Sequence, residues 1–249
     1  MAVISGLPVV AVTAGFNAPL FATRLDAMGY SDQLIGLNAA ANSVAPFIMA
    51  PLAPLILARY GLARVMIVSA ILEALLFVAC IFVPGFWGWS AIRLVMGFIA
   101  GVSWVAGEVW ITQAATDATR GRVLAIYNSS FGMGTAAGPL LLTWAGHAGN
   151  TPFILAAVLL AVSVLPIYWA RHLAPVMEGD GHRPSIRLLV VPLCRAPVPM
   201  MLNLSYAMVF VAIWTFLPVY AVDTNYSVDH AYLQLSVFAV GSIVLQLPI

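Results

Sequence analysis

Long apolar runs recur along this chain, and short polar or turn-rich breaks separate them. Each run has about 20 residues, the length of helix that crosses a bilayer core of roughly 30 Å. In lipid, each backbone amide must find its partner within its own segment. Runs with scattered Gly and Pro therefore suit helices better than the alternating strands of a barrel. The pattern predicts an all-α, polytopic membrane protein.

The charge content fits a chain whose main solvent is lipid. Only 8% of the residues are charged and 63% are apolar, whereas about 25% of an ordinary soluble domain is charged. The net charge of +1 gives no support for nucleic-acid binding. Cys80 and Cys194 have neither the number nor the spacing of a disulfide framework or a metal site, so we expect both to be structural.

The apolar windows predict eight spans. They lie at about residues 3–23, 34–57, 65–84, 88–113, 123–145, 151–170, 199–221 and 231–249. The first run lacks a cationic leader and a small-residue cleavage site, so we expect it to be retained. These spans divide the chain into a six-helix bundle (1–170), a polar cytoplasmic linker (171–198) and the start of a second bundle with helices seven and eight (199–249).

The arginines predict the orientation, because cytoplasmic loops retain cationic residues during insertion. All ten cationic residues are Arg, and eight fall in alternate connections: Arg59, Arg64, Arg120, Arg122, Arg171, Arg183, Arg187 and Arg195. The opposite connections hold only Arg24 among several aspartates. Both termini are therefore expected in the cytoplasm.

The chain also contains a weak internal repeat. Pro19-Leu20-Phe21-Ala22 is echoed by Pro218-Val219-Tyr220-Ala221, and Tyr30-Ser31 by Tyr226-Ser227, at a period of about 197 residues. Parallel repeats of six spans are a known transporter construction, with the substrate held between the halves near mid-membrane. By this count the chain stops two helices into its second half, so we expect it to be a fragment that does not transport by itself.

The connection between the second and third spans carries a recognisable motif. It resembles the Gly-x-Leu-Ala-Asp-Arg-x-Gly-Arg-Arg signature of the major facilitator superfamily, which Arg59, Gly61 and Arg64 match, while Pro54 and Ala58 replace the Gly and the Asp. The resemblance implies a bacterial inner-membrane transporter in which this loop latches helices and halves on the cytoplasmic side. The alternative is that these arginines serve only the positive-inside rule.

The fourth span opens with a second motif. Arg93, Gly97 and Gly101 resemble the family's Arg-x-x-x-Gly-x-x-x-Gly pattern on a cavity-lining helix, and the two glycines allow a close helix approach. Arg93 lies roughly 6–9 Å inside the aromatic interface of Trp87 and Trp89. It either snorkels to that interface or is a buried cation with a substrate or coupling role.

A third group of residues lies farther along. Glu108 near the end of the fourth span, followed by Arg120 and Arg122, resembles a run in bacterial efflux-type members. Glu108 is about 22 Å along the helix from Arg93, so the two cannot pair. We interpret Glu108 as one partner of a cytoplasmic gating salt bridge, the alternative being a substrate carboxylate.

The fifth span contains Gly134, Gly138 and Pro139, which resemble the core of the family's antiporter motif. Small residues and a Pro favour a closely packed, bent helix that seals one side of a cavity. Simple helix packing is the alternative reading, because Gly-x-x-x-Gly is common in membrane helices.

Polar residues within the spans supply candidates for a cavity. Glu73 is costly when ionised in lipid, as expected of a proton carrier, although third helices in this family usually lie outside the cavity. The other candidates, each either a ligand contact or an interhelical hydrogen bond, are Asn17, Asn38, Asn42, Trp104, Tyr127, Asn128, Asn203, Tyr206 and Trp214. Together they suggest an amphipathic or weakly polar organic solute.

The sequence favours a secondary transporter over other classes. The expected form is proton-coupled efflux of a small organic solute by alternating access, with a proton-coupled nutrient importer as the alternative. A P-loop is absent from the sequence, as are the His-Glu-x-x-His and Gly-x-Ser-x-Gly motifs, so we expect neither ATP coupling, nor enzymatic activity, nor a cofactor. The alternatives from another class are a non-transporting receptor or scaffold with the same fold, or a membrane-embedded enzyme.

Overall fold

The computed structural model describes residues 2–49, 51–116, 118–146, 149–175 and 196–246. These residues form α-helices joined by short connections, without a β-strand among them. The helices are α1 (Ala2–Ala27), α2 (Asp32–Met49), α3 (Ala53–Tyr60), α4 (Leu62–Phe82), α5 (Phe86–Ala114), α6 (Arg120–Ala145), α7 (Thr151–Ala170), the 3₁₀ turn η1 (Arg171–Leu173), α9 (Pro197–Asp223) and α10 (Val228–Gln246). The fold class predicted from the sequence is confirmed.

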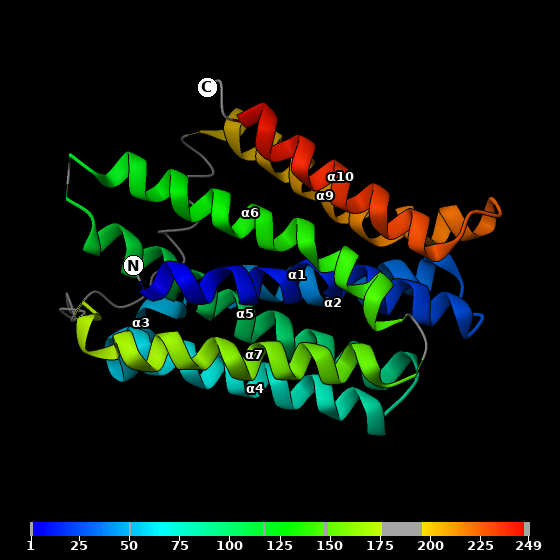
Figure 1. Cartoon of the computed structure of the whole chain (residues 1–249), viewed down its shortest axis with the longest axis horizontal. Helices are drawn as coiled ribbons and strands as arrows, with labels where there is room; N and C mark the ends of the chain where they lie inside the picture. Colours follow the sequence, from blue (N-terminus) through cyan, green and yellow to red (C-terminus); the bar gives the residue numbers. More distant parts are fainter. Residues whose placement is uncertain (1, 50, 117, 147–148, 176–195, 247–249) are drawn as a thin grey trace.

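The first six predicted spans form one bundle and the last two lie on its side (Figure 1). In the bundle, α1 packs on α6 and α7, α2 packs on α5, and α4 packs on α5 and α7. The pair α9 and α10 packs on α1, α2 and α6. The described residues thus form one bundle of the first six spans, with the pair α9 and α10 packed on its side.

The second predicted span, 34–57, is not one continuous helix. It is divided between α2 and α3, and the Leu52 N–H donates to the Met49 carbonyl across the break at 2.9 Å. Pro51 and Pro54 explain the interruption, because a proline has no N–H to donate and its ring clashes with the preceding turn of a helix. The other predicted spans match single helices to within a few residues.

The length and the apolar composition of the helices agree with a protein that crosses a membrane several times. Among the described residues, α4, α5, α7 with its 3₁₀ turn, and α9 are long and apolar enough to span a bilayer, and the bent pair α2 and α3 would make a fifth span. Helices α1 and α6, with 26 residues each, are about 39 Å long at 1.5 Å per residue. By length alone, each could reach across the same thickness, although neither is among the helices that also meet the apolar criterion.

Two helix crossings depend on glycines, whose lack of a side chain lets the backbones approach closely. A Cβ at Gly101 would lie 2.8 Å from Pro46 Cα, and one at Gly97 would meet the Asn42 carbonyl, so α5 lies backbone to backbone against α2. A Cβ at Gly138 would lie 2.6 Å from the Val12 carbonyl oxygen, which places α6 equally close to α1. Membrane helices use small residues in this way to gain van der Waals contact.

The two ends of the molecule differ. The arginine-rich end carries Arg59, Arg64, Arg120, Arg122 and Arg171, and the opposite end carries the α1–α2, α6–α7 and α9–α10 connections. Figure 1 shows α9 and α10 near α1 and α2 at the opposite end and diverging from α1 toward the arginine-rich end. Correspondingly, the second half of α9 is buried at Trp214, Thr215 and Val219, whereas residues 197–206 are exposed.

Part of the predicted linker lies outside the described residues. Residues 171–173 form the 3₁₀ turn, Ala174 and Pro175 follow it, and the structure next describes the chain from Ala196. Residues 176–195, including Cys194, are not described. Cys80 is a buried free thiol in α4.

Candidate functional site

A cavity of about 200 Å³ lies inside the six-helix bundle. Its walls come from α1, α2, α4, α5, α6 and α7, and no described residue of α9 or α10 lines it. A substrate position between the two halves, as the repeat implies, stays a prediction. In this structure α9 and α10 come near α1 and α2 toward the opposite end of the molecule.

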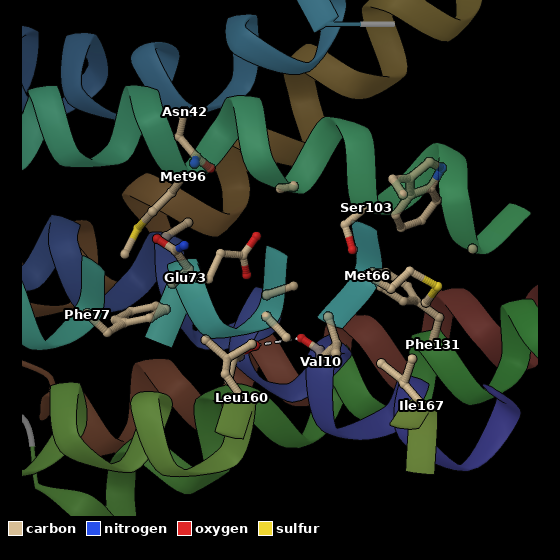
Figure 2. A pocket seen from close by; sticks show the side chains of 18 of the residues that line it. Val10, Asn42, Met66, Glu73, Phe77, Met96, Ser103, Phe131, Leu160 and Ile167 are labelled. Carbon is tan, nitrogen blue, oxygen red and sulfur yellow. Dashed lines mark hydrogen bonds between the residues drawn. The ribbon is translucent and has the colours of Figure 1, made fainter. Parts of the chain in front are cut away.

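The carboxylate of Glu73 lies in this cavity. Figure 2 shows Glu73 projecting into the space, with Asn42 and Met96 on one side and Leu160 on the other. It is the one acidic side chain among the described lining residues. A carboxylate enclosed by mainly apolar walls has little to stabilise its charge.

Glu73 reaches the cavity because one face of α4, which carries a stripe of cavity-lining residues, is turned toward the bundle interior. The cavity-lining residues of α4 follow the 4-3-4 spacing of one helix face: Met66, Ala70, Glu73 and Phe77. Helix α4 packs between α5 and α7, so this stripe faces the bundle interior. The third span thus lines the cavity, although third helices in this family usually lie outside it.

Four of the predicted cavity residues line the same space as Glu73: Asn17, Asn42, Trp104 and Tyr127. The Asn42 side chain donates to the Arg93 carbonyl at 3.0 Å, and the Trp104 ring meets the Phe131 ring edge-on with centroids 4.7 Å apart. Asn17 Oδ1 is buried and has no hydrogen-bond partner among the described protein atoms. The lining therefore combines aromatic walls with a few polar atoms.

Arg93 is buried beside the cavity and does not line it. Its guanidinium donates to Asn38 Oδ1 at 2.7 Å and lies 4.9 Å from the centre of the Phe21 ring. Asn38 is itself held by a 2.9 Å hydrogen bond from its amide to Ser90. Arg93 is only 2% exposed, so its guanidinium does not snorkel to the interface. Its Nε has no partner, and the structure records no ion pair for Arg93 within the described ranges.

The remaining predicted cavity residues lie elsewhere. Asn128 on α6 and both Asn203 and Tyr206 on α9 are exposed. Trp214 is buried in a cluster with Ala136 of α6 and Leu235 of α10, and its Nε1 has no hydrogen-bond partner among the described protein atoms. The cavity does not bring these four side chains together with Glu73.

The candidate gate residues gather at the arginine-rich end. Gly61 has a φ of +80° and joins α3 to α4, a conformation that Gly adopts without strain. The Arg59 guanidinium lies 5.4 Å from the centre of the Tyr60 ring. Glu108 accepts a 3.0 Å hydrogen bond from Trp104, and the described residues form no ion pair with it.

The other two gate candidates, Arg120 and Arg122, are exposed at the start of α6. The gating salt bridge expected between Glu108 and one of Arg59, Arg64 or Arg120 stays a prediction. The helix-packing candidates Gly134, Gly138 and Pro139 are all buried in the middle of α6.

Several lining residues were missed in the sequence. Phe131 lies one helical turn after Tyr127, and Ser103 lies one residue before Trp104. For Phe131, the available signal in the sequence was its position one helical turn after Tyr127, a predicted cavity residue.

A hydrogen bond between α1 and α10 was also missed in the sequence. The hydroxyls of Thr23 on α1 and Tyr232 on α10 lie 2.9 Å apart, and both residues are buried.

These features define a multi-pass, all-α membrane protein with a mainly apolar cavity that holds one carboxylate inside a six-helix bundle. The family model described as Major Facilitator Superfamily matches residues 4–249. The chain belongs to this superfamily of membrane transporters.

Individual relatives agree with the family. The chain is 26% identical over 239 residues to YfkF of Bacillus subtilis (strain 168), an uncharacterized MFS-type transporter; the match covers 94% of this chain and 61% of YfkF. It is 30% identical over 95 residues to YcaD of Escherichia fergusonii, covering 38% of this chain and 25% of that protein. It is 29% identical over 136 residues to Ent638_1421 of Enterobacter sp. (strain 638), covering 52% and 33%. The chain thus spans less than two thirds of the length of these relatives.

Proposed function

We propose that the protein is a secondary active transporter that exports a small amphipathic organic solute in exchange for protons by alternating access. It would act in a bacterial inner membrane with its N-terminus in the cytoplasm. The observation that carries this proposal is the Glu73 carboxylate inside a mainly apolar cavity of the bundle.

Glu73 has the surroundings of a proton carrier. An ionised carboxylate in a low-dielectric site is costly unless it is paired, and a bound proton or a cationic group removes that cost. The described lining offers Glu73 no basic side chain. Proton and solute would therefore compete for the same carboxylate, which is the basis of an exchange.

The cavity walls favour an amphipathic solute. Aromatic and thioether side chains, among them Phe77, Phe131, Met66 and Met96, present apolar surface, while Asn17 supplies an unpartnered amide oxygen. Binding sites for small organic molecules combine such apolar walls with a few polar atoms that fix orientation.

A chain of contacts connects Glu73 to Arg93. Phe77 lies one turn after Glu73, its ring lies 6.5 Å from that of Phe21, and Phe21 carries the Arg93 guanidinium on its face. A change in charge or packing at Glu73 can thus reach Arg93 and its hydrogen bond to Asn38. We propose Arg93 as a positioning residue of the coupling machinery.

Alternating access is supported by the unequal ends of the molecule. The two halves are held together at one end by the Thr23–Tyr232 hydroxyl pair and by Phe216, whose ring packs 3.3 Å from the position of a Cβ at Gly36. At the arginine-rich end α9 is exposed. In this arrangement solute would enter from the arginine-rich side, as export from the cytoplasm requires. The small-residue stretch of α6 around Gly134 and Gly138 agrees with the antiporter form.

The test is transport by the protein expressed from its complete coding sequence, reconstituted into liposomes with ethidium as the amphipathic probe. Glu73→Gln should abolish flux driven by a pH gradient while ethidium exchange without a gradient continues. Asp32→Asn is the control, because it removes an exposed carboxylate outside the cavity. Gradient-driven flux that survives in Glu73→Gln would refute the role of Glu73, and proton-driven uptake in place of export would favour the importer.

A further inference from the structure

A second hollow, of about 390 Å³, lies on the flank of the bundle near the arginine-rich end. Its walls come from α2, α3, α4 and α5 and are almost wholly apolar: Met49, Ile56, Val65, Val68, Phe98, Ile99 and Val102. Its polar side chains are Tyr60, Arg64 and Ser69. We name it the flank groove.

The break between α2 and α3 shapes this groove. Helix α2 ends at Met49, and Ile56 belongs to α3 beyond the break, yet both line the groove. An unbroken second span would instead run straight along α5. The interruption leaves Phe98, Ile99 and Val102 of α5 as the floor of an open channel.

A third hollow, of about 640 Å³, adjoins the flank groove at its arginine-rich mouth. The two share Tyr60 and Arg64, and the third hollow adds Arg171, whose guanidinium lies 3.9 Å from the centre of the Tyr168 ring. No described residue that lines either hollow is acidic. The arginine-bearing hollow thus meets the apolar flank groove at Tyr60 and Arg64.

We infer that these two hollows bind one anionic phospholipid. Its phosphate would lie between Arg64 and Arg171, and one acyl chain would follow the flank groove past Val68 toward Ser69. From Arg64 to Ser69 the groove descends about 7.5 Å along α4 at 1.5 Å per residue, away from the helix start and toward the bilayer interior. Guanidinium groups bind phosphate in a planar, two-point manner, and basic pockets between membrane helices suit anionic headgroups.

The combination of charge and shape selects this occupant. A transported solute would need access to the central cavity, and the flank groove shares no lining residue with that cavity. Free phosphate would use the arginines but leave the apolar channel unfilled. A phospholipid satisfies both parts, and the inference does not depend on what the protein transports.

The experiment is native mass spectrometry of the full chain in detergent, with phosphatidylglycerol and phosphatidylcholine of identical acyl chains as probes. The wild type should retain phosphatidylglycerol in preference to phosphatidylcholine. Arg64→Gln should weaken phosphatidylglycerol retention about fivefold. Arg122→Gln, which removes an exposed arginine at the same end but outside both hollows, should leave it unchanged.

A second pair of variants tests the channel without changing charge. Val68→Trp places an indole in the groove from its exposed side and should also weaken retention, whereas Val78→Trp, at an exposed site farther along α4, should not. Circular dichroism confirms that each variant is helical. Equal losses in Arg64→Gln and Arg122→Gln, equal retention of both lipids, unchanged retention in Val68→Trp, or full displacement by inorganic phosphate would each overturn the inference.

Discussion

At the scale of single residues, Arg93 shows how a buried cation is accommodated by uncharged partners in the part of the chain that the structure describes. The Asn38 oxygen accepts its hydrogen bond, and the face of the Phe21 ring lies against its guanidinium. Hydrogen bonds to charged groups and cation–π contacts both strengthen when water is excluded. The residue type was visible in the sequence, but its partners come from two other helices.

The first prediction concerns this pair. Asn38→Ala leaves the Arg93 guanidinium without its acceptor, so the free energy of unfolding should fall by about 1–3 kcal/mol. Thermal unfolding of the purified protein in detergent measures the change. Asn128→Ala, at an exposed position, is the matched control and should shift the midpoint little. An equal shift in both variants would mean that the Asn38 bond does not stabilise Arg93.

At the scale of helices, most elements followed from local signals. Apolar run length and the polar breaks predicted the bounds of seven helices to within a few residues. The exception is the α2–α3 break, which the prolines at positions 51 and 54 signal but which an apolar window passes over. Hydrophobicity alone cannot detect a missing backbone hydrogen bond.

The second prediction concerns the crossing of α1 and α6. Gly138→Ala puts a Cβ 2.6 Å from the Val12 carbonyl oxygen, on backbone that cannot move aside cheaply, so the variant should be destabilised by about 1–3 kcal/mol. Gly121→Ala, on the same helix with nothing within 4 Å of the added Cβ, should be neutral or slightly stabilising. Comparison of the two unfolding midpoints tests the crossing, and equal midpoints would contradict it.

At the scale of the whole molecule, the two halves meet at one end and diverge at the other. The third prediction follows from this asymmetry. In a variant without Cys80 and Cys194, a water-soluble thiol reagent should label Asn128→Cys and Asn203→Cys quickly and Thr215→Cys slowly, because only Thr215 is buried between helices. Adding Tyr232→Phe removes the hydroxyl pair with Thr23 and should speed labelling at position 215. Equal rates at all three positions would show that the halves do not diverge as described.

The sequence by itself determined the class of this protein. The length of the apolar runs, the demand of lipid for internal backbone hydrogen bonds and the motifs around Arg59 and Arg93 were enough to predict helices, a membrane and the family. These are local properties, and each can be seen within a short window of residues.

Only the tertiary structure decided which faces of the helices meet. In lipid, the residues facing the bilayer and those facing the bundle are both apolar, so the sequence pattern does not show which side of α4 turns inward. Packing of α4 between α5 and α7 placed Glu73 in the cavity, and packing of α2 on α5 placed Asn38 against Arg93. Each of these contacts joins residues far apart in the chain, and the steric fit of small residues at the crossings, not local hydropathy, selects them.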